Sequence, residues 1–225
     1  MGLGFGMMAA FCWERDAMRC RVKICGITSV ADAQMAAAAG VDAIGLVFYP
    51  PSKRNVEIAQ AAAICRSVPP FVTTVGLFLD AEADFVRAVL AAAPLDVLQF
   101  HGSESPEYCR QFPRPYLKAV GMKGLVEYGG FHAYADRYAD AQGFLVDSHA
   151  PGAAGGTGET FDWTQVPQDY AKPIILAGGL TPENVADAIR ASRVYAVDVS
   201  SGVESAPGVK DAAKVTAFMR AAASS

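Results

Sequence analysis

Short apolar runs recur along this chain and alternate with segments that have helical spacing. Two of these runs, Ala43–Phe48 and Thr73–Leu79, are almost wholly apolar, which is typical of parallel strands buried on both faces. Eight strands are predicted, beginning at residues 21, 43, 73, 97, 116, 143, 173 and 194. The mean step between their starts is about 25 residues, enough for a strand, a helix and two loops.

Helix start and stop residues fill the intervals between these strands. Either Thr28 or Ser29 can cap a helix after the first strand, and Asp80 can cap one after the third. After the seventh strand, Thr181 is the predicted N-cap and Pro182 the first helical residue. The closing helix is predicted over Val209–Ala223. Strand and helix therefore alternate to the end of the chain.

Eight such alternations predict a single-domain α/β protein, a parallel (βα)8 TIM barrel. The alternative is a doubly wound open sheet, but its glycine-rich turn should follow the first strand. Here the glycine-rich turns follow strands six, seven and eight. We expect residues 20–225 to form the barrel and residues 1–19 to be a non-essential N-terminal extension.

Composition narrows the possible partners. The chain is 52% hydrophobic and 19% charged, which suits a large buried core and argues against disorder. Its net charge of −4 offers no general basic surface for nucleic acid, so a small molecule is the expected partner. No apolar stretch is long enough to cross a membrane, including the one at Gly2–Trp13.

Cysteine and histidine usage indicates a reducing cytoplasm and argues against a metal-binding site. The five cysteines are odd in number and contain no CxxC pair, so no disulfide framework is expected. The three histidines are scattered, and no Cys/His cluster has metal-ligand spacing. We therefore expect a cytoplasmic protein with no bound metal.

Polar residues gather at the predicted ends of the strands, where parallel barrels carry their active sites. These residues are Cys25, Arg54, His101, Asp147 and Asp198. A lone cysteine is as readily a small buried hydrophobe. Because five polar strand ends converge on one mouth, a catalytic interpretation of Cys25 is favoured.

Four positions concern the walls of this mouth. Lys23 shares a strand face with Cys25 and is predicted to pair with an inward acid inside the barrel. Asp198 is predicted either to orient a substrate or to pair inside the barrel. Gln99 and His101 share a face of the fourth strand and are expected to shape the pocket.

Two glycine-containing turns close strands seven and eight. They are AGGL (Ala177–Leu180) and SSG (Ser200–Gly202). Glycine lets backbone N–H groups approach an anion closely, and a following helix N-terminus adds partial positive charge. Tight strand-to-helix packing would also require glycine, but two such turns on adjacent strands favour a phosphate site.

Seven stretches, in order, resemble the phosphoribosylanthranilate isomerase family of tryptophan biosynthesis. They are KICGIT, GLVFYPPSKRNV, VGLFLD, LDVLQFHG, VDSHAPGAAGGTGETFDW, IILAGGLTPENV and VDVSSGVESAPGVKD. The resemblance runs from about Arg21 to Ala221. It implies a cofactor-free barrel and an aldose–ketose isomerase. The implied reaction is the Amadori rearrangement of N-(5′-phosphoribosyl)anthranilate to 1-(2-carboxyphenylamino)-1-deoxyribulose 5-phosphate.

The resemblance also implies roles for individual residues. Cys25 of KICGIT is the expected general base, Asp147 the general acid, and Arg54 the ligand of the anthranilate carboxylate. His101 and Asp198 are expected to contact substrate. The expected phosphate ligands are the backbones of Gly178, Gly179, Ser201 and Gly202.

The residue types suit this chemistry. The furanose ring oxygen must gain a proton for the ring to open, so Asp147 would have to keep its proton in a water-poor mouth. The iminium that results makes the C2′ proton acidic, and a thiolate can remove it. We therefore expect the pKa of Cys25 to be lowered by a helix N-terminus or by the cationic intermediate.

Two other functions are compatible with a phosphate-binding barrel. A sugar-phosphate isomerase of histidine biosynthesis would favour an aspartate at the end of strand one, where this chain has Cys25. A barrel that binds phosphorylated ligands without turnover would not need both Cys25 and Asp147, and both are present. The expected assembly is a monomer or a homodimer.

Overall fold

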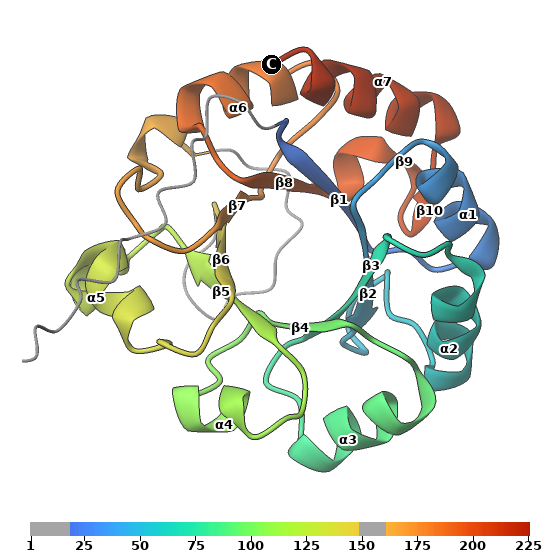
Figure 1. Cartoon of the computed structure of the whole chain (residues 1–225), viewed down its shortest axis with the longest axis horizontal. Helices are drawn as coiled ribbons and strands as arrows, with labels where there is room; N and C mark the ends of the chain where they lie inside the picture. The colour runs from blue at the N-terminus through green and yellow to red at the C-terminus, as the bar shows by residue number, and fades with distance from the viewer. Residues whose placement is uncertain (1–18, 149–160) are drawn as a thin grey trace, which may run out of the picture.

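A computed structural model describes residues 19–148 and 161–225, and its eight parallel strands close into a barrel (Figure 1). The strands are β1 (Arg21–Cys25), β2 (Ala43–Phe48), β3 (Thr73–Phe78), β4 (Val97–Phe100), β5 (Tyr116–Gly121), β6 (Gly143–Asp147), β7 (Ile174–Leu176) and β8 (Ala196–Val199). Each strand pairs with the next in the chain, and β8 pairs with β1. The predicted (βα)8 barrel is confirmed. Residues 1–18 of the expected extension lie outside the described residues.

Helices surround the barrel as an outer ring (Figure 1). They are α1 (Val30–Ala38), α2 (Ile58–Ser67), α3 (Ala83–Ala92), α4 (Pro106–Arg110), α5 (Gly130–Asp136), α6 (Val185–Ser192) and α7 (Ala212–Ala223). Short 3-10 helices are η2 (Leu125–Tyr128), η3 (Trp163–Gln165) and η4 (Ser201–Val203). A two-stranded antiparallel hairpin, β9 (Glu204–Ala206) with β10 (Val209–Lys210), stands between β8 and α7. No helix in the described part of the chain is long and apolar enough to cross a membrane.

The core has two parts because side chains alternate along each strand. Outward side chains such as Phe48, Phe78 and Phe144 are almost fully buried against the helices. Leu145 lies between the outward residues Phe144 and Val146 of β6 and belongs to a separate small cluster inside the barrel. That inner cluster consists of Ala119, Leu145, Ile175, Ala177 and Ala196. It fills the β5–β8 side of the barrel interior with small and branched side chains.

A buried ion pair also lies in the outer layer, between β5 and the loop after β4. Lys118 Nζ lies 2.9 Å from Glu104 Oε2 and donates to the carbonyls of Phe100 and Gly102 at 3.2 and 2.6 Å. Glu104 Oε1 accepts from the Asp80 backbone N–H. Both charged groups are therefore satisfied away from the mouth.

Two predicted helix starts are wrong. Ser29 does cap α1, its hydroxyl accepting from the Asp32 N–H at 3.0 Å. The third helix, however, begins at Ala83, because Asp80 has a φ of 48° and its carboxylate accepts from a neighbouring loop. Thr181 does not cap α6, whose N-cap is Asn184; Thr181 and Asn184 instead close a turn before the helix.

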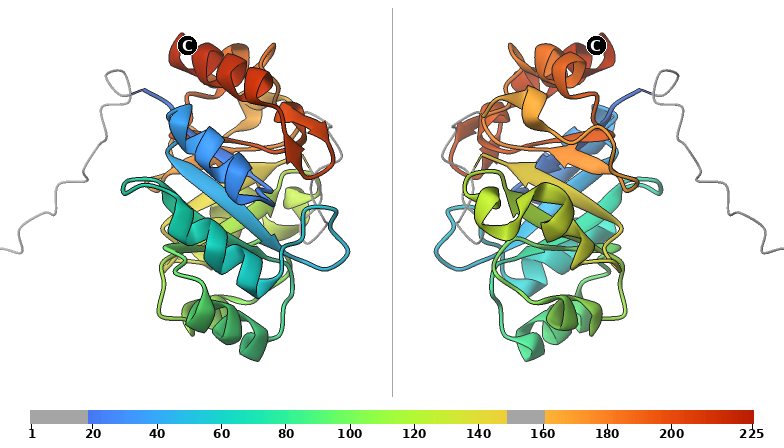
Figure 2. Two further views of the ribbon diagram at one scale, coloured as in Figure 1. Left: turned by 90° about the vertical axis from the view of Figure 1, so that its right-hand side faces the viewer. Right: turned by 90° about the vertical axis from the view of Figure 1, so that its left-hand side faces the viewer.

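The predicted closing helix is wrong in its first residues. Val209 and Lys210 form β10, and α7 begins at Ala212 with the Asp211 carboxylate accepting from Lys214 N–H at 3.0 Å. Gly208, with a φ of 84°, makes the preceding turn. The hairpin and the loop after β2 project from the same end of the barrel (Figure 2).

Candidate active site

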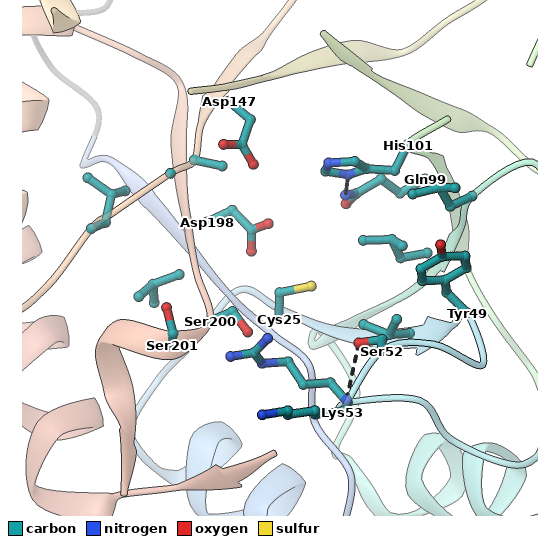
Figure 3. A pocket seen from close by; sticks show the side chains of 18 of the residues that line it. Cys25, Tyr49, Ser52, Lys53, Gln99, His101, Asp147, Asp198, Ser200 and Ser201 are labelled. Carbon is teal, nitrogen blue, oxygen red and sulfur yellow. Dashed lines mark hydrogen bonds between the residues drawn. The ribbon is translucent and has the colours of Figure 1, made fainter. Parts of the chain in front are cut away.

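A cavity of about 370 Å³ opens at the carboxyl ends of the barrel strands (Figure 3). All of the predicted site residues except Gly202 line it. They are Cys25, Arg54, His101, Asp147, Gly178, Gly179, Asp198 and Ser201. The described residues contain no cluster of His, Cys, Asp and Glu side chains able to hold a metal ion.

The reactive groups reach the cavity from different strands. The thiol of Cys25, at the end of β1, points into the open space (Figure 3). Asp147 of β6 and Asp198 of β8 lie on one side of it, and Gln99 and His101 lie across from them. Cys25 and Asp147 are each only 6% exposed, so both side chains lie in a water-poor environment.

Lys23 and Asp198 form a buried ion pair below this mouth. Barrel closure places them opposite each other in the β1–β8 register, and Lys23 Nζ lies 2.8 Å from Asp198 Oδ2. The predicted inward pairing of Lys23 is confirmed. Asp198 Oδ1 is buried and has no hydrogen-bond partner among the described residues. Burial raises the pKa of Asp198, although Lys23 opposes the rise.

The surroundings of Cys25 pull its thiol in two directions. A Cβ on Gly45 of β2 would lie 2.8 Å from Cys25 Sγ and 3.1 Å from Lys23 Cε, so thiol and lysine are close neighbours. Burial raises the pKa of Cys25, whereas the charge of Lys23 lowers it, and burial prevails. The expected lowering of this pKa is therefore wrong for the ligand-free site.

Arg54, in the loop after β2, lies across the end of β1. A Cβ on Gly26 would come within 2.5 Å of Arg54 Cδ, so glycine allows the arginine stem to lie against the residue after Cys25. The guanidinium forms a two-point ion pair, with Nε and Nη2 each 2.8 Å from a carboxylate oxygen of Glu204. Glu204 was not among the residues predicted for the site.

The two glycine turns are packed directly against each other. A Cβ on Gly202 would lie 1.9 Å from the carbonyl oxygen of Leu180, so only glycine permits this contact. Gly178 and Gly179 both have positive φ angles, 89° and 63°, and line the cavity beside Ser201. Gly202 thus brings the turns together rather than lining the cavity itself.

Gln99 and His101 form one wall of the cavity. Gln99 Nε2 lies 3.1 Å from His101 Nδ1, as the shared strand face predicted. Gln99 Oε1 is buried without a hydrogen-bond partner in the described part of the chain. The pair shapes the pocket and presents a spare acceptor near it.

Comparisons with known proteins show the family to which this chain belongs. The model for the family described as N-(5'phosphoribosyl)anthranilate (PRA) isomerase matches residues 22–221. N-(5'-phosphoribosyl)anthranilate isomerase of Cellvibrio japonicus is 56% identical over 201 residues, which is 89% of this chain and 92% of that protein.

Solved structures are similar as well. Phosphoribosyl anthranilate isomerase from Thermotoga maritima is 40% identical with a TM-score of 0.81, covering 90% of this chain and 98% of that one. Another structure shows phosphoribosyl anthranilate isomerase in complex with reduced 1-(o-carboxyphenylamino)-1-deoxyribulose 5-phosphate. That protein is 38% identical with a TM-score of 0.78, over 90% of this chain and 98% of its own.

Proposed function

This chain belongs to the N-(5'-phosphoribosyl)anthranilate isomerase family, and we propose that it catalyses the Amadori rearrangement of N-(5′-phosphoribosyl)anthranilate to 1-(2-carboxyphenylamino)-1-deoxyribulose 5-phosphate. One observation carries the proposal. The Cys25 thiol and the Asp147 carboxyl group face one cavity from β1 and β6, on separate sides of the space a sugar would occupy. An acid and a base are thereby held apart, as this reaction requires.

Asp147 is the proposed general acid. It donates its proton to the furanose ring oxygen as the C1′–O4′ bond breaks. The lone pair of the anthranilate nitrogen then forms the C1′=N bond, which produces an iminium cation. Asp147 is buried, and Ser148 Oγ donates to its Oδ1 at 3.2 Å, so the group that transfers the proton is held in place.

Cys25 is the proposed general base. Its thiolate takes the C2′ proton, and the C–H electrons form a C1′=C2′ bond while the iminium nitrogen is neutralised. The resulting enol then tautomerises: C1′ gains a proton and the 2′-hydroxyl loses one, which gives the ketone product. Because burial raises the pKa of Cys25, the thiolate depends on positive charge nearby. Lys23 supplies one such charge, and the iminium supplies a second when substrate is present.

Four groups are proposed to hold the substrate. Arg54 binds the anthranilate carboxylate through the guanidinium edge that Glu204 leaves open. The backbones of the two glycine turns bind the phosphate, the usual phosphate position in such barrels. Asp198 Oδ1, which has no partner in the described residues, accepts from a sugar hydroxyl. His101 contacts substrate as part of the wall that it forms with Gln99.

The test is direct turnover. Purified protein, without added metal or nucleotide, is mixed with N-(5′-phosphoribosyl)anthranilate, and the loss of anthranilate-type fluorescence is followed while chromatography identifies the product. We expect stoichiometric conversion to the carboxyphenylamino deoxyribulose phosphate. Folded protein that leaves the substrate unchanged would overturn the proposal.

A further inference from the structure

Glu204 is a buried carboxylate that holds two cations of the site. It is 8% exposed and begins the β9–β10 hairpin, directly after η4. Arg54 donates to it from Nε and Nη2, both at 2.8 Å, and Lys210 donates from Nζ, also at 2.8 Å. Burial raises the pKa of Glu204, but hydrogen bonds from Arg54 and Lys210 outweigh this and leave the pKa lowered. Glu204 is therefore ionised near neutral pH.

The same network reaches the turn after β8. Lys210 Nζ donates to the Ser200 carbonyl at 3.1 Å, and Ser200 lines the cavity. Lys214 Nζ donates to the Glu204 backbone carbonyl at 2.7 Å, which fixes the hairpin that carries the carboxylate. Glu204 thus stands between the arginine after β2 and the turn after β8.

Two bonds from one carboxylate determine the orientation of a guanidinium. The guanidinium is planar, so fixing Nε and Nη2 fixes its plane and the direction in which Nη1 points. An arginine side chain held by its stem alone would sample many rotamers and would lose that freedom on binding a ligand. An Arg54 that is already ordered avoids this loss.

We propose that Glu204 is a positioning residue. It holds Arg54 so that the free guanidinium edge meets the ring carboxylate of the substrate, in register with the phosphate turn that Lys210 contacts. This inference rests on the proposed function of Arg54. A buried ion pair by itself adds little net stability. Preorganisation of Arg54 therefore accounts for the network better than fold stability does.

The test compares two ligands across a double-mutant cycle. The first is the reduced 1-(o-carboxyphenylamino)-1-deoxyribulose 5-phosphate, and the second is the same molecule without its ring carboxylate. Dissociation constants are measured for wild type, Glu204→Gln, Arg54→Ala and the double variant. We expect Glu204→Gln to weaken binding of the carboxylated ligand about tenfold and binding of the other ligand less than about threefold.

The double variant separates positioning from a direct contact. If Glu204 acts through Arg54, Glu204→Gln should cause little further loss of discrimination once Arg54 is alanine. Glu204→Asp, which keeps the charge and moves it back by one methylene, should recover part of the discrimination. If the Glu204→Gln protein does not fold, Glu204→Asp takes its place in the cycle. The expected loss of preference for the carboxylated ligand is then intermediate between wild type and Arg54→Ala.

Glu104→Gln is the matched control, because it also breaks a buried Glu–Lys pair, away from the cavity lining. It should lower the melting temperature without changing the ratio of the two affinities. If Glu204→Gln weakens binding of both ligands equally while Arg54→Ala loses the preference for the carboxylated ligand, the positioning role of Glu204 is overturned. The carboxylate role of Arg54 would then stand. An Arg54→Ala protein that still discriminates normally would overturn the carboxylate role of Arg54 as well.

Discussion

At the scale of single residues, the chemistry of Cys25 depends on its neighbours. The thiol is buried, which favours the protonated form, while Lys23 stands close enough to favour the thiolate. Asp198 shares the charge of Lys23 through their 2.8 Å ion pair and so limits its effect on the thiol. Cys25 is therefore held as a thiol, and in the proposed mechanism it becomes a base when the cationic intermediate forms beside it.

This arrangement predicts a difference between two pH profiles. In the free protein the Cys25 thiol should titrate above the ordinary value of 9.0, so kcat/KM should rise with pH through that raised pKa. The rise in kcat should occur at lower pH, because the iminium in the complex favours the thiolate. The thiol is titrated by thiolate absorbance as the difference between wild type and Cys25→Ser. A Cys25 that titrates below its ordinary value in the ligand-free protein would contradict this explanation.

At the scale of elements, the strands were more predictable than the turns between them. A strand buried on both faces is a continuous apolar run, and β2 and β6 begin and end where the sequence predicted. The segment before α7 has no such pattern, because Val209 and Lys210 fit a helix start as well as a strand. Tertiary pairing with β9 decides between them.

Glu204 was not predicted from the sequence for a related reason. Glu204 is 150 positions from Arg54, its partner, and only barrel closure and the hairpin bring them together. Residues at strand ends, such as Cys25 and Asp147, could be predicted because the fold itself determines where strand ends lie. A carboxylate on a short hairpin outside the barrel repeat has no comparable signal.

Adding one methyl group at Gly202 tests whether the contact between the glycine turns is needed to bind phosphate. Gly202→Ala should force the turns apart, because the new Cβ would lie 1.9 Å from the Leu180 carbonyl. We expect affinity for the reduced phosphorylated ligand to fall about tenfold or more relative to its dephosphorylated form. Titration calorimetry with both ligands measures this ratio.

Gly143→Ala provides the control for that variant. Its Cβ would meet the Pro173 carbonyl at 2.8 Å, but at the start of β6, the opposite end of the barrel from the turns. It should reduce thermal stability and leave the phosphate preference intact. If Gly202→Ala retains the wild-type ratio, the glycine turns do not form the phosphate site.

At the scale of the whole molecule, closure of the barrel creates the site. Lys23 and Asp198 are 175 positions apart yet form an ion pair, because β8 returns to lie beside β1. The family match covers residues 22–221, and Arg19 is anchored to Asp42 by two hydrogen bonds of 2.8 and 2.6 Å. The part of the chain needed for closure is thus present from Arg19 onward.

Removal of residues 1–17 should consequently have little effect. We expect the melting temperature to stay within about 2 °C of that of the full chain and kcat to stay within about twofold. Differential scanning calorimetry and the fluorescence assay measure these quantities on both proteins. A fall of several degrees would show that the extension contributes to the stability of the barrel.

The central claim is that Cys25 and Asp147 share the acid–base work of the isomerisation, and kcat of two isosteric variants at pH 7.5 tests it most directly. Cys25→Ser keeps the size of the side chain but forms little base near neutral pH, and Asp147→Asn keeps the shape but has no acidic proton. Each should lower kcat by at least ~10²-fold while affinity for the reduced ligand changes far less, with folding checked by circular dichroism. A folded Cys25→Ser protein with wild-type kcat would contradict the thiolate mechanism, and a fully active Asp147→Asn protein would contradict the assignment of the acid.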